Sequence, residues 1–464
     1  MAVSDSTQFV ADLTRVVGND RIITTFSTDA TIDWWPLALK RAAALEAEPP
    51  VALVSPRTAE EVAAIMRLCT IAGIPVTPFG GGSGVVGAAI PKRGGVLLDM
   101  VQMRKVRTID LRNQLVMADG GVLADRLEQQ LRAEGYSLGI NPDSLSLSTI
   151  GGLVATAATG PGAGRNGGIE RRLAGIEVVL ADGTLVKTPI MPRWGLGPNL
   201  SQLFVGSEGT LGVVTGVTLR IVRPRQRLYA ACIFPSLQHG LTALRAVMRD
   251  GLRPASILLF DEEASKLHRD LLDRPREGSL LLLNCEGPVR LAALEEELTL
   301  NICRDHQALD LGRKPAERWE AQRTKLPPAH AALRQPGVMI DAIDIQATWD
   351  QLGETYSAVR AALAEHCADV SATFSYCTEQ GSAITFTIAI NAATDDEAIA
   401  SYRQAWQAAM TATMENGAAI AHHQGIGLAR APWFRAALGD AYPLWSRLKE
   451  ALDPDHLLNP GTLT

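Results

Sequence analysis

The sequence predicts an α+β fold made of a first domain with short strands, followed by a cap domain with an antiparallel sheet and helices on one face. The first domain is indicated by residues 50–224, where short apolar runs alternate with small-residue loops. The cap domain is indicated from Leu228 onward, where strand patterns and amphipathic helix patterns alternate. Three glycine-rich stretches, at residues 78–87, 142–152 and 206–216, all fall in the first domain.

Changes of pattern divide the chain into four parts. Two prolines at residues 49–50 mark the first boundary, and the segment "RPRQ" ends the first domain. The parts are an N-terminal helical segment (1–48), the first domain (49–225), the cap domain (226–415) and a C-terminal segment that returns to the first domain (416–464).

Apolar runs of strand length and longer amphipathic runs define the cap elements. The expected strands are residues 228–234, 255–261, 278–287, 336–345, 368–377 and 382–390, and the expected helices include residues 237–251, 291–306 and 348–367. In the first domain, residues 94–100 and 213–222 are expected to be strands, and residues 151–160 a small-residue helix.

The first glycine-rich stretch has the composition of a phosphate-binding turn. An apolar run, "GIPVTPF", leads into Gly80, Gly81, Gly82, Ser83 and Gly84, where missing side chains let successive backbone N–H groups surround a diphosphate. No Lys-Ser/Thr pair follows, and the next run is a strand, so neither a P-loop nor a dinucleotide-binding βαβ unit is indicated.

The other two stretches complete a candidate cofactor site. The second offers short polar groups suited to a sugar-like chain and phosphates, and the glycines of the third let backbone approach a flat ligand. Besides the five residues of the first turn, the candidates for cofactor binding are Pro78, Pro142, Asp143, Ser144, Ser148, Thr149, Gly151, Gly152, Ala155, Thr156, Glu208, Gly209, Gly212, Val213 and Val214.

Composition excludes several other classes of protein. The formal charge of −6 over 464 residues leaves no basic surplus for a nucleic acid. Apolar runs end well before 18 residues and the N-terminus lacks a signal-peptide pattern, so we expect a cytoplasmic protein without a membrane span. Six cysteines without a CxxC pair indicate scattered reduced thiols.

The three glycine-rich stretches, in this order, resemble those of the FAD-linked oxidoreductases of the vanillyl-alcohol oxidase and para-cresol methylhydroxylase (PCMH) superfamily. The similarity runs from about residue 50 to "LDPDHLLNPG" at 452–461 and is strongest toward D-2-hydroxy-acid dehydrogenases, glycolate oxidase subunits and alkyldihydroxyacetonephosphate synthase. Segments 253–261, 345–352 and 422–433 resemble the synthase branch in particular. The resemblance implies a PCMH-type FAD-binding domain of two α+β subdomains, and an enzyme that oxidises a CH–OH group. The first two loops contain no His or Cys, so we expect FAD to be bound noncovalently.

Oxidation of an alcohol requires a base for the hydroxyl proton. The family carries a histidine in an "HGIG" motif, but this chain has Gln424 there, preceded by His422 and His423. Glutamine cannot take a proton at neutral pH. Either His423 or His422 is therefore the base, or Gln424 hydrogen-bonds a substrate oxygen in a reaction whose base lies elsewhere. Tyr376 is a further catalytic candidate, because a phenol can exchange a proton if its pKa falls.

Departures from the synthase pattern favour an oxidoreductase. Thr385 and Ala157 stand where synthases are expected to carry a tyrosine and an arginine. A synthase-like transferase without net redox change, and a flavoprotein subunit that needs a partner, stay open as alternatives. The histidine pair that holds a metal in neighbouring dehydrogenases is missing from residues 376–386, so we expect no metal.

The substrate is expected to be a small anion similar to a 2-hydroxy acid. Cations that could bind it are Arg334, Arg323 and Lys325, with Arg334 in the position that best matches the family. Other expected partners are an electron acceptor that the sequence does not identify and a second copy of the chain in a homodimer.

Overall fold

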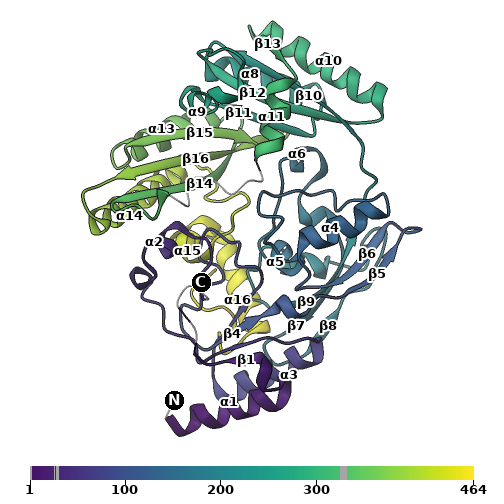
Figure 1. Cartoon of the computed structure of the whole chain (residues 1–464), viewed down its shortest axis with the longest axis vertical. Coiled ribbons are helices and arrows are strands. Elements are labelled where there is room, and N and C mark those ends of the chain that lie inside the picture. The colour runs from purple at the N-terminus through teal and green to yellow at the C-terminus, as the bar shows by residue number, and fades with distance from the viewer. Residues whose placement is uncertain (1–2, 26, 28–30, 324–331, 464) are drawn as a thin grey trace.

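The computed structural model describes residues 3–25, 27, 31–323 and 332–463. Within these ranges, two subdomains of the first domain and the cap domain each contain one sheet. In Figure 1 the cap lies above the two subdomains, and the C-terminal segment, in yellow, runs from the cap back to the lower part of the molecule.

The N-terminal subdomain has a four-stranded sheet in the order β1-β2-β4-β3, with β2, β3 and β4 parallel and β1 antiparallel to β2. Its helix α3 begins where the Thr58 side chain accepts the N–H of Glu61, and it ends at Gly73, whose φ of 62° suits glycine. The elements are α1 (Val3–Val17), β1 (Ile22–Ile23), α2 (Pro36–Arg41), β2 (Ala52–Val54), α3 (Ala59–Ala72), β3 (Val76–Phe79) and β4 (Val96–Asp99).

The second subdomain has a five-stranded antiparallel sheet in the order β5-β6-β9-β7-β8. The Thr149 hydroxyl caps its short helix α5 by accepting the N–H of Gly152. The elements are β5 (Val106–Asp110), β6 (Leu115–Asp119), α4 (Ala124–Ala133), α5 (Ile150–Ala155), α6 (Ala163–Asn166), α7 (Ile169–Arg172), β7 (Leu173–Val179), β8 (Leu185–Lys187) and β9 (Val213–Arg220).

The cap sheet has seven antiparallel strands in the order β13-β10-β12-β11-β15-β16-β14. Its strands are β10 (Gln226–Phe234), β11 (Ser256–Phe260), β12 (Ser279–Gly287), β13 (Leu309–Gly312), β14 (Val338–Thr348), β15 (Asp369–Ser375) and β16 (Gly381–Asn391). Its helices are α8 (Leu237–Arg249), α9 (Glu262–Leu267), α10 (Val289–Asp305), α11 (Lys314–Gln322), α13 (Leu352–Ala364) and α14 (Asp395–Glu415).

The two faces of the cap sheet are covered differently. Helices α8, α10, α13 and α14 pack on one face, where Phe234, Leu283 and Phe386 belong to the largest apolar core. On the other face, α11 packs over one part of the sheet through Ala316, which joins a separate apolar cluster with Leu280 and Leu282. The predicted single covered face therefore holds for the four large helices. Helix α11 and the short helix α9, whose Ala264 joins the same cluster as Ala316, are additions on the second face. The rest of that second face is left to line a cavity.

The C-terminal segment joins the cap to the first domain through α15 (Gly427–Leu438) and α16 (Tyr442–Leu452). Lys449 of α16 is buried, forms an ion pair with Asp453, and donates from Nζ to the carbonyl oxygens of Thr210 at 2.7 Å and Leu458 at 3.1 Å. These bonds attach the third glycine-rich loop to the C-terminus. Among the described residues, no helix has both the length and the apolar character needed to cross a bilayer.

Candidate active site

A cavity of about 620 Å³ lies between the first domain and the cap. All the residues that the sequence predicts for cofactor binding line it, from Pro78 in the first loop to Val214 in the third. The candidate catalytic residues His423 and Tyr376 and the candidate substrate ligand Gln424 also line it, whereas His422 does not. The fold thus places the three glycine-rich loops and the segment at residues 422–427, here called the histidine motif, around one cavity.

Glycines in the loops allow the loops to contact one another. A Cβ atom on Gly81 would lie 1.6 Å from the carbonyl oxygen of Leu147, and one on Gly80 would lie 2.4 Å from Oγ1 of Thr149. A Cβ on Gly209 would lie 2.9 Å from Cγ of Pro78. The missing side chain of Gly209 therefore makes room for the first loop. Gly209 also lines the cavity, so its close approach to a flat ligand stays a prediction.

The first loop keeps its backbone donors free. In the described part of the chain, the N–H groups of Gly81, Gly82, Ser83 and Gly84 form no hydrogen bond, and all four residues line the cavity. The Ser83 and Ser148 hydroxyls are joined at 2.8 Å, which holds the first two loops together. A row of unpaired N–H groups at a cavity wall fits the diphosphate of FAD.

One row of residues crosses the open face of the cap sheet. Asp344 of β14 is paired with Thr385 of β16, Thr385 with Thr373 of β15, and Thr373 with Phe260 of β11. Thr385, Thr373 and Phe260 line the cavity. Asp344 itself is fully buried, because the histidine motif covers it.

Two buried carboxylates hold the backbone of the histidine motif. Oδ2 of Asp344 accepts the N–H groups of His422, His423 and Gln424, at 2.9, 2.7 and 3.3 Å. Glu208 of the third glycine-rich loop accepts the N–H groups of Ile426 and Gly427, at 2.6 and 2.9 Å. The motif is therefore bound to the cap sheet at one end and to a cofactor loop at the other.

Asp344 also carries a buried ion pair. Arg430 of α15 is fully buried and donates from Nη2 to Oδ1 of Asp344 at 2.5 Å. Burial acts to raise the pKa of Asp344, but Arg430, His423 and the backbone donors outweigh burial and hold that pKa well below its usual range. Asp344 is thus a fixed negative charge at neutral pH.

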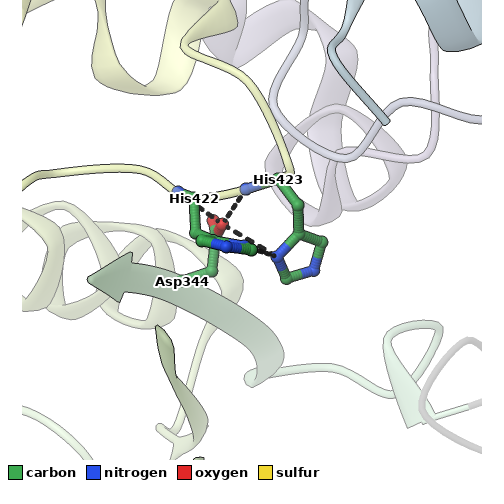
Figure 2. Close-up of side chains that lie close together, drawn as sticks. All are labelled: Asp344, His422 and His423. Carbon is green, nitrogen blue, oxygen red and sulfur yellow. Dashed lines mark hydrogen bonds and ion pairs between the residues drawn. The ribbon is translucent and has the colours of Figure 1, made fainter. Parts of the chain in front are cut away.

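His423 is oriented by this charge, as Figure 2 shows. Its Nδ1 lies 3.2 Å from Oδ2 of Asp344 and 3.1 Å from Nδ1 of His422. A nitrogen that faces a carboxylate carries the hydrogen, so the other ring nitrogen, Nε2, is bare in the neutral imidazole. In Figure 2 this second nitrogen points away from Asp344.

The rings of His422 and Tyr376 complete the cluster. Tyr376 follows the end of β15 with a φ of 52°, and its ring centroid lies 4.5 Å from that of His422 and 5.1 Å from that of His423. Burial lowers the pKa of His422 to about 4 and raises the pKa of Tyr376 to about 12. At neutral pH His422 is uncharged, and Tyr376 is a hydrogen-bond donor. Tyr376 could act as a base only if its pKa were lowered, whereas burial raises this pKa.

Gln424 is held with its amide in one orientation. Its Oε1 accepts a hydrogen bond from Nη2 of Arg430 at 3.1 Å. Because Gln424 lines the cavity, its Nε2 remains to donate to a ligand oxygen.

Of the three candidate cations of the sequence, the two that the structure describes do not line the cavity. Arg334 is exposed and is not among the cavity residues, so the geometry does not support it as an anion clamp, and its role stays a prediction. The Arg323 side chain is buried and forms ion pairs with Asp143 at 2.5 Å and with Glu320 at 2.9 Å. These carboxylates already balance its positive charge. Lys325 lies outside the described residues.

Asp344 and Arg430 are the two important residues that sequence reasoning missed. One signal was present, because Asp341 and Asp344 interrupt an otherwise apolar strand pattern at residues 338–345. Buried carboxylates in a strand need partners, and those partners come from segments far along the chain.

Glu208 predicts a pH dependence of stability. Burial raises its pKa from 4.5 to about 7, against the opposing N–H bonds from Gly427 and Ile426. Between these pH values the folded protein keeps a proton that the unfolded chain has released, so this group makes stability fall as pH rises. Asp33, with a pKa raised to about 7, acts in the same direction, and His422 acts in the opposite one. The Glu208→Gln variant lacks this titration. We therefore expect the difference in melting temperature, variant minus parent, to increase between pH 4.5 and 7 and to stay constant above pH 7. A difference that stays constant with pH would contradict the prediction.

Comparison with known families identifies the class of protein. Residues 50–189 match the FAD binding domain family, and residues 223–463 match the family of FAD linked oxidases, C-terminal domain. The chain belongs to the FAD-linked oxidase family, and FAD is its cofactor.

Individual relatives include enzymes with different reactions. The chain is 27% identical to alkyldihydroxyacetonephosphate synthase of Dictyostelium discoideum over 450 residues, which cover 89% of this chain and 73% of the relative. It is 28% identical to probable mitochondrial D-lactate dehydrogenase of Danio rerio over 427 residues, covering 89% and 84%. It is also 28% identical to the uncharacterised FAD-linked oxidoreductase YgcU of Escherichia coli K12 over 476 residues, covering 98% and 97%.

Solved structures support the fold. An alkyldihydroxyacetonephosphate synthase superposes with a TM-score of 0.82 at 23% identity, covering 98% of this chain and 85% of the other. Substrate-bound p-cresol methylhydroxylase superposes with a TM-score of 0.78 at 16% identity, covering 100% and 97%. The predicted PCMH-type fold is confirmed.

Proposed function

We propose that this protein oxidises the CH–OH group of a small anionic substrate similar to a 2-hydroxy acid. The observation that carries the proposal is the Asp344–His423 pair at the wall of the cavity, with Nδ1 of His423 held 3.2 Å from the carboxylate. Bound FAD supplies a two-electron acceptor for the hydride of the substrate. The protein must position the alcohol carbon and remove the hydroxyl proton.

His423 is the proposed base. Its Nε2 accepts the hydroxyl proton, and the negative charge of Asp344 stabilises the imidazolium that results. The amide Nε2 of Gln424 and the hydroxyl of Tyr376 donate hydrogen bonds to the substrate carboxylate or to the carbonyl oxygen of the product. Gln424 therefore replaces the family histidine as a hydrogen-bond donor, and the adjacent residue takes the proton.

Asp344, His422 and His423 could also hold a metal ion, because their ligand atoms lie within 4.8 Å of one another. We favour the proton-transfer role. The carboxylate oxygens already accept three backbone N–H groups and the Arg430 guanidinium, so they have little remaining capacity for a cation. Metal analysis of the purified protein checks this choice, and one tightly bound equivalent of metal would contradict it.

The same site allows an alternative. The synthase relative favours a transferase without net redox change. However, Thr385 lines the cavity at the position where a synthase is expected to carry a tyrosine. An anaerobic screen of 2-hydroxy acids, polyols and simple alcohols separates the two reactions. We expect at least one 2-hydroxy acid to reduce the flavin, which is seen as loss of its absorbance band in the visible range. If no alcohol does so in a protein whose flavin dithionite reduces normally, the proposed oxidation is wrong.

FAD is proposed to be bound without a covalent link. Among the described residues that line the cavity, His423 is the only His or Cys, and its Nδ1 is held by Asp344. We therefore expect acid precipitation to release all the FAD into the supernatant. Flavin that stays with the precipitated chain would contradict this prediction and would point to His423 as the attachment site.

A further inference from the structure

A second cavity, of about 770 Å³, also lies between the first domain and the cap. It is separate from the flavin cavity but adjacent to it, because the loops at residues 141–143 and 159–161 contribute to both. Helix α6, whose residues line it, lies directly below the cap in Figure 1. The proposed oxidation makes no use of this space.

The second cavity is strongly basic in an acidic protein. Seven arginines and three glutamates line it, although the whole chain has a formal charge of −6. Four of the seven arginines have carboxylate partners. Arg165 pairs with Glu295 at 2.6 Å and Arg227 with Glu286 at 3.1 Å, and Arg323 and Arg132 are likewise paired.

The other three, Arg172, Arg223 and Arg225, have no carboxylate partner among the described residues. Arg223 contacts Tyr136 through its Nε, at 3.5 Å from the phenol oxygen. Arg172 is the most constrained of the three. Its Nη2 makes one long bond, 3.4 Å to the carbonyl oxygen of Asn166, and its Nε is buried without a hydrogen-bond partner.

A half-buried guanidinium without a counterion is costly. Burial lowers the pKa of Arg172, and the nearby charges of Glu170 and Glu286 offset only part of this effect. Gly139 has a φ of 72°, which favours glycine, and a Cβ there would lie 2.9 Å from Cγ2 of Val222 and 3.1 Å from Cζ of Arg172. Arg172 is therefore a half-buried cation that forms no ion pair among the described residues.

We propose that this second cavity binds a small phosphate-bearing anion of nucleotide size. The guanidinium groups of Arg172, Arg223 and Arg225, which line the cavity, match the oxygens of a phosphate or diphosphate, because such oxygens accept paired N–H donors. The volume lies in the range of small-molecule sites. Asn284 adds a further recognition group, because its buried Oδ1 has no hydrogen-bond partner and can accept from a hydroxyl or amino group of the ligand.

The site is tested by calorimetric titration of the FAD-loaded protein with ADP and with inorganic pyrophosphate at constant ionic strength. FAD-loaded protein is required because both probes could enter an empty flavin cavity. We expect one saturable site per chain for each probe. In the double variant Arg172→Gln, Arg223→Gln, affinity should fall at least about tenfold, since each charged hydrogen bond contributes about 1.5 to 3 kcal/mol.

The matched control is Arg193→Gln, which removes an exposed arginine outside both cavities. It should bind the probes like the parent. All variants must retain full FAD content, which shows that the fold is intact. Absence of saturable binding in the parent, or equal binding in the parent and the double variant, would overturn the proposal. Failure of the proposed alcohol oxidation would leave it unaffected, because the titration does not depend on turnover.

Discussion

His423→Ala is expected to lower turnover by about 10²- to 10⁴-fold, the range that a positioned base contributes. The imidazole of His423 lines the cavity, and Asp344 holds its Nδ1 at 3.2 Å, so the variant loses the proposed proton acceptor. FAD content should stay the same, because the loops that we expect to bind the diphosphate are unchanged. The measurement is the rate of anaerobic flavin reduction by the substrate found in the screen.

Tyr376→Phe is the matched comparison for this prediction. It keeps the ring that packs 5.1 Å from His423 and removes only the hydroxyl, so a smaller loss of rate is expected. If Tyr376→Phe abolishes flavin reduction and His423→Ala does not, the hydroxyl of Tyr376 takes part in proton transfer and the proposed role of His423 is wrong. Gln424→His should be tolerated, because it restores the residue that the family carries.

Asp344→Asn is expected to lower the free energy of unfolding by about 3 to 5 kcal/mol, the usual cost of leaving a buried charge without its partner. The charge left behind is Arg430, whose guanidinium is fully buried against Asp344. An amide group also cannot accept all the backbone donors that Asp344 now accepts, so the histidine motif should loosen. Denaturant unfolding of the FAD-loaded protein measures the effect.

Asp341→Asn is the control for Asp344→Asn on the same strand. Asp341 accepts hydrogen bonds from the Tyr402 hydroxyl at 2.7 Å and from Nε1 of Trp406 at 3.2 Å, and it has no ion pair among the described residues. Burial raises its pKa to about 6, so loss of its charge removes an unfavourable buried charge. Its substitution should cost much less stability. Similar losses in the two variants would show that the Arg430 ion pair has no special importance.

Much of the fold could be predicted because its signals are local. The cap strands β10, β11, β12, β14, β15 and β16 all lie at apolar runs of strand length, and α8, α10 and α13 lie at amphipathic runs between them. The short edge strand β13 and helix α11 were not predicted. Strand β13 has only four residues, and all of them are exposed or half-buried. An exposed edge strand carries no apolar pattern to recognise.

The sequence by itself determined the class of this protein. Three glycine-rich loops in fixed order are contiguous motifs, so they could be predicted to be cofactor loops without knowledge of distant contacts. The same holds for His422, His423 and Gln424, whose departure from the family motif is visible in the letters alone.

Tertiary structure alone decided what those side chains can do. Arg430 reaches Asp344 across 86 positions, and Glu208 reaches Ile426 across 218. Folding also placed Arg334 on the surface and grouped unpaired arginines in a second cavity. Charge, protonation and orientation depend on which groups share a buried space, and that depends on chain segments brought together by the whole fold.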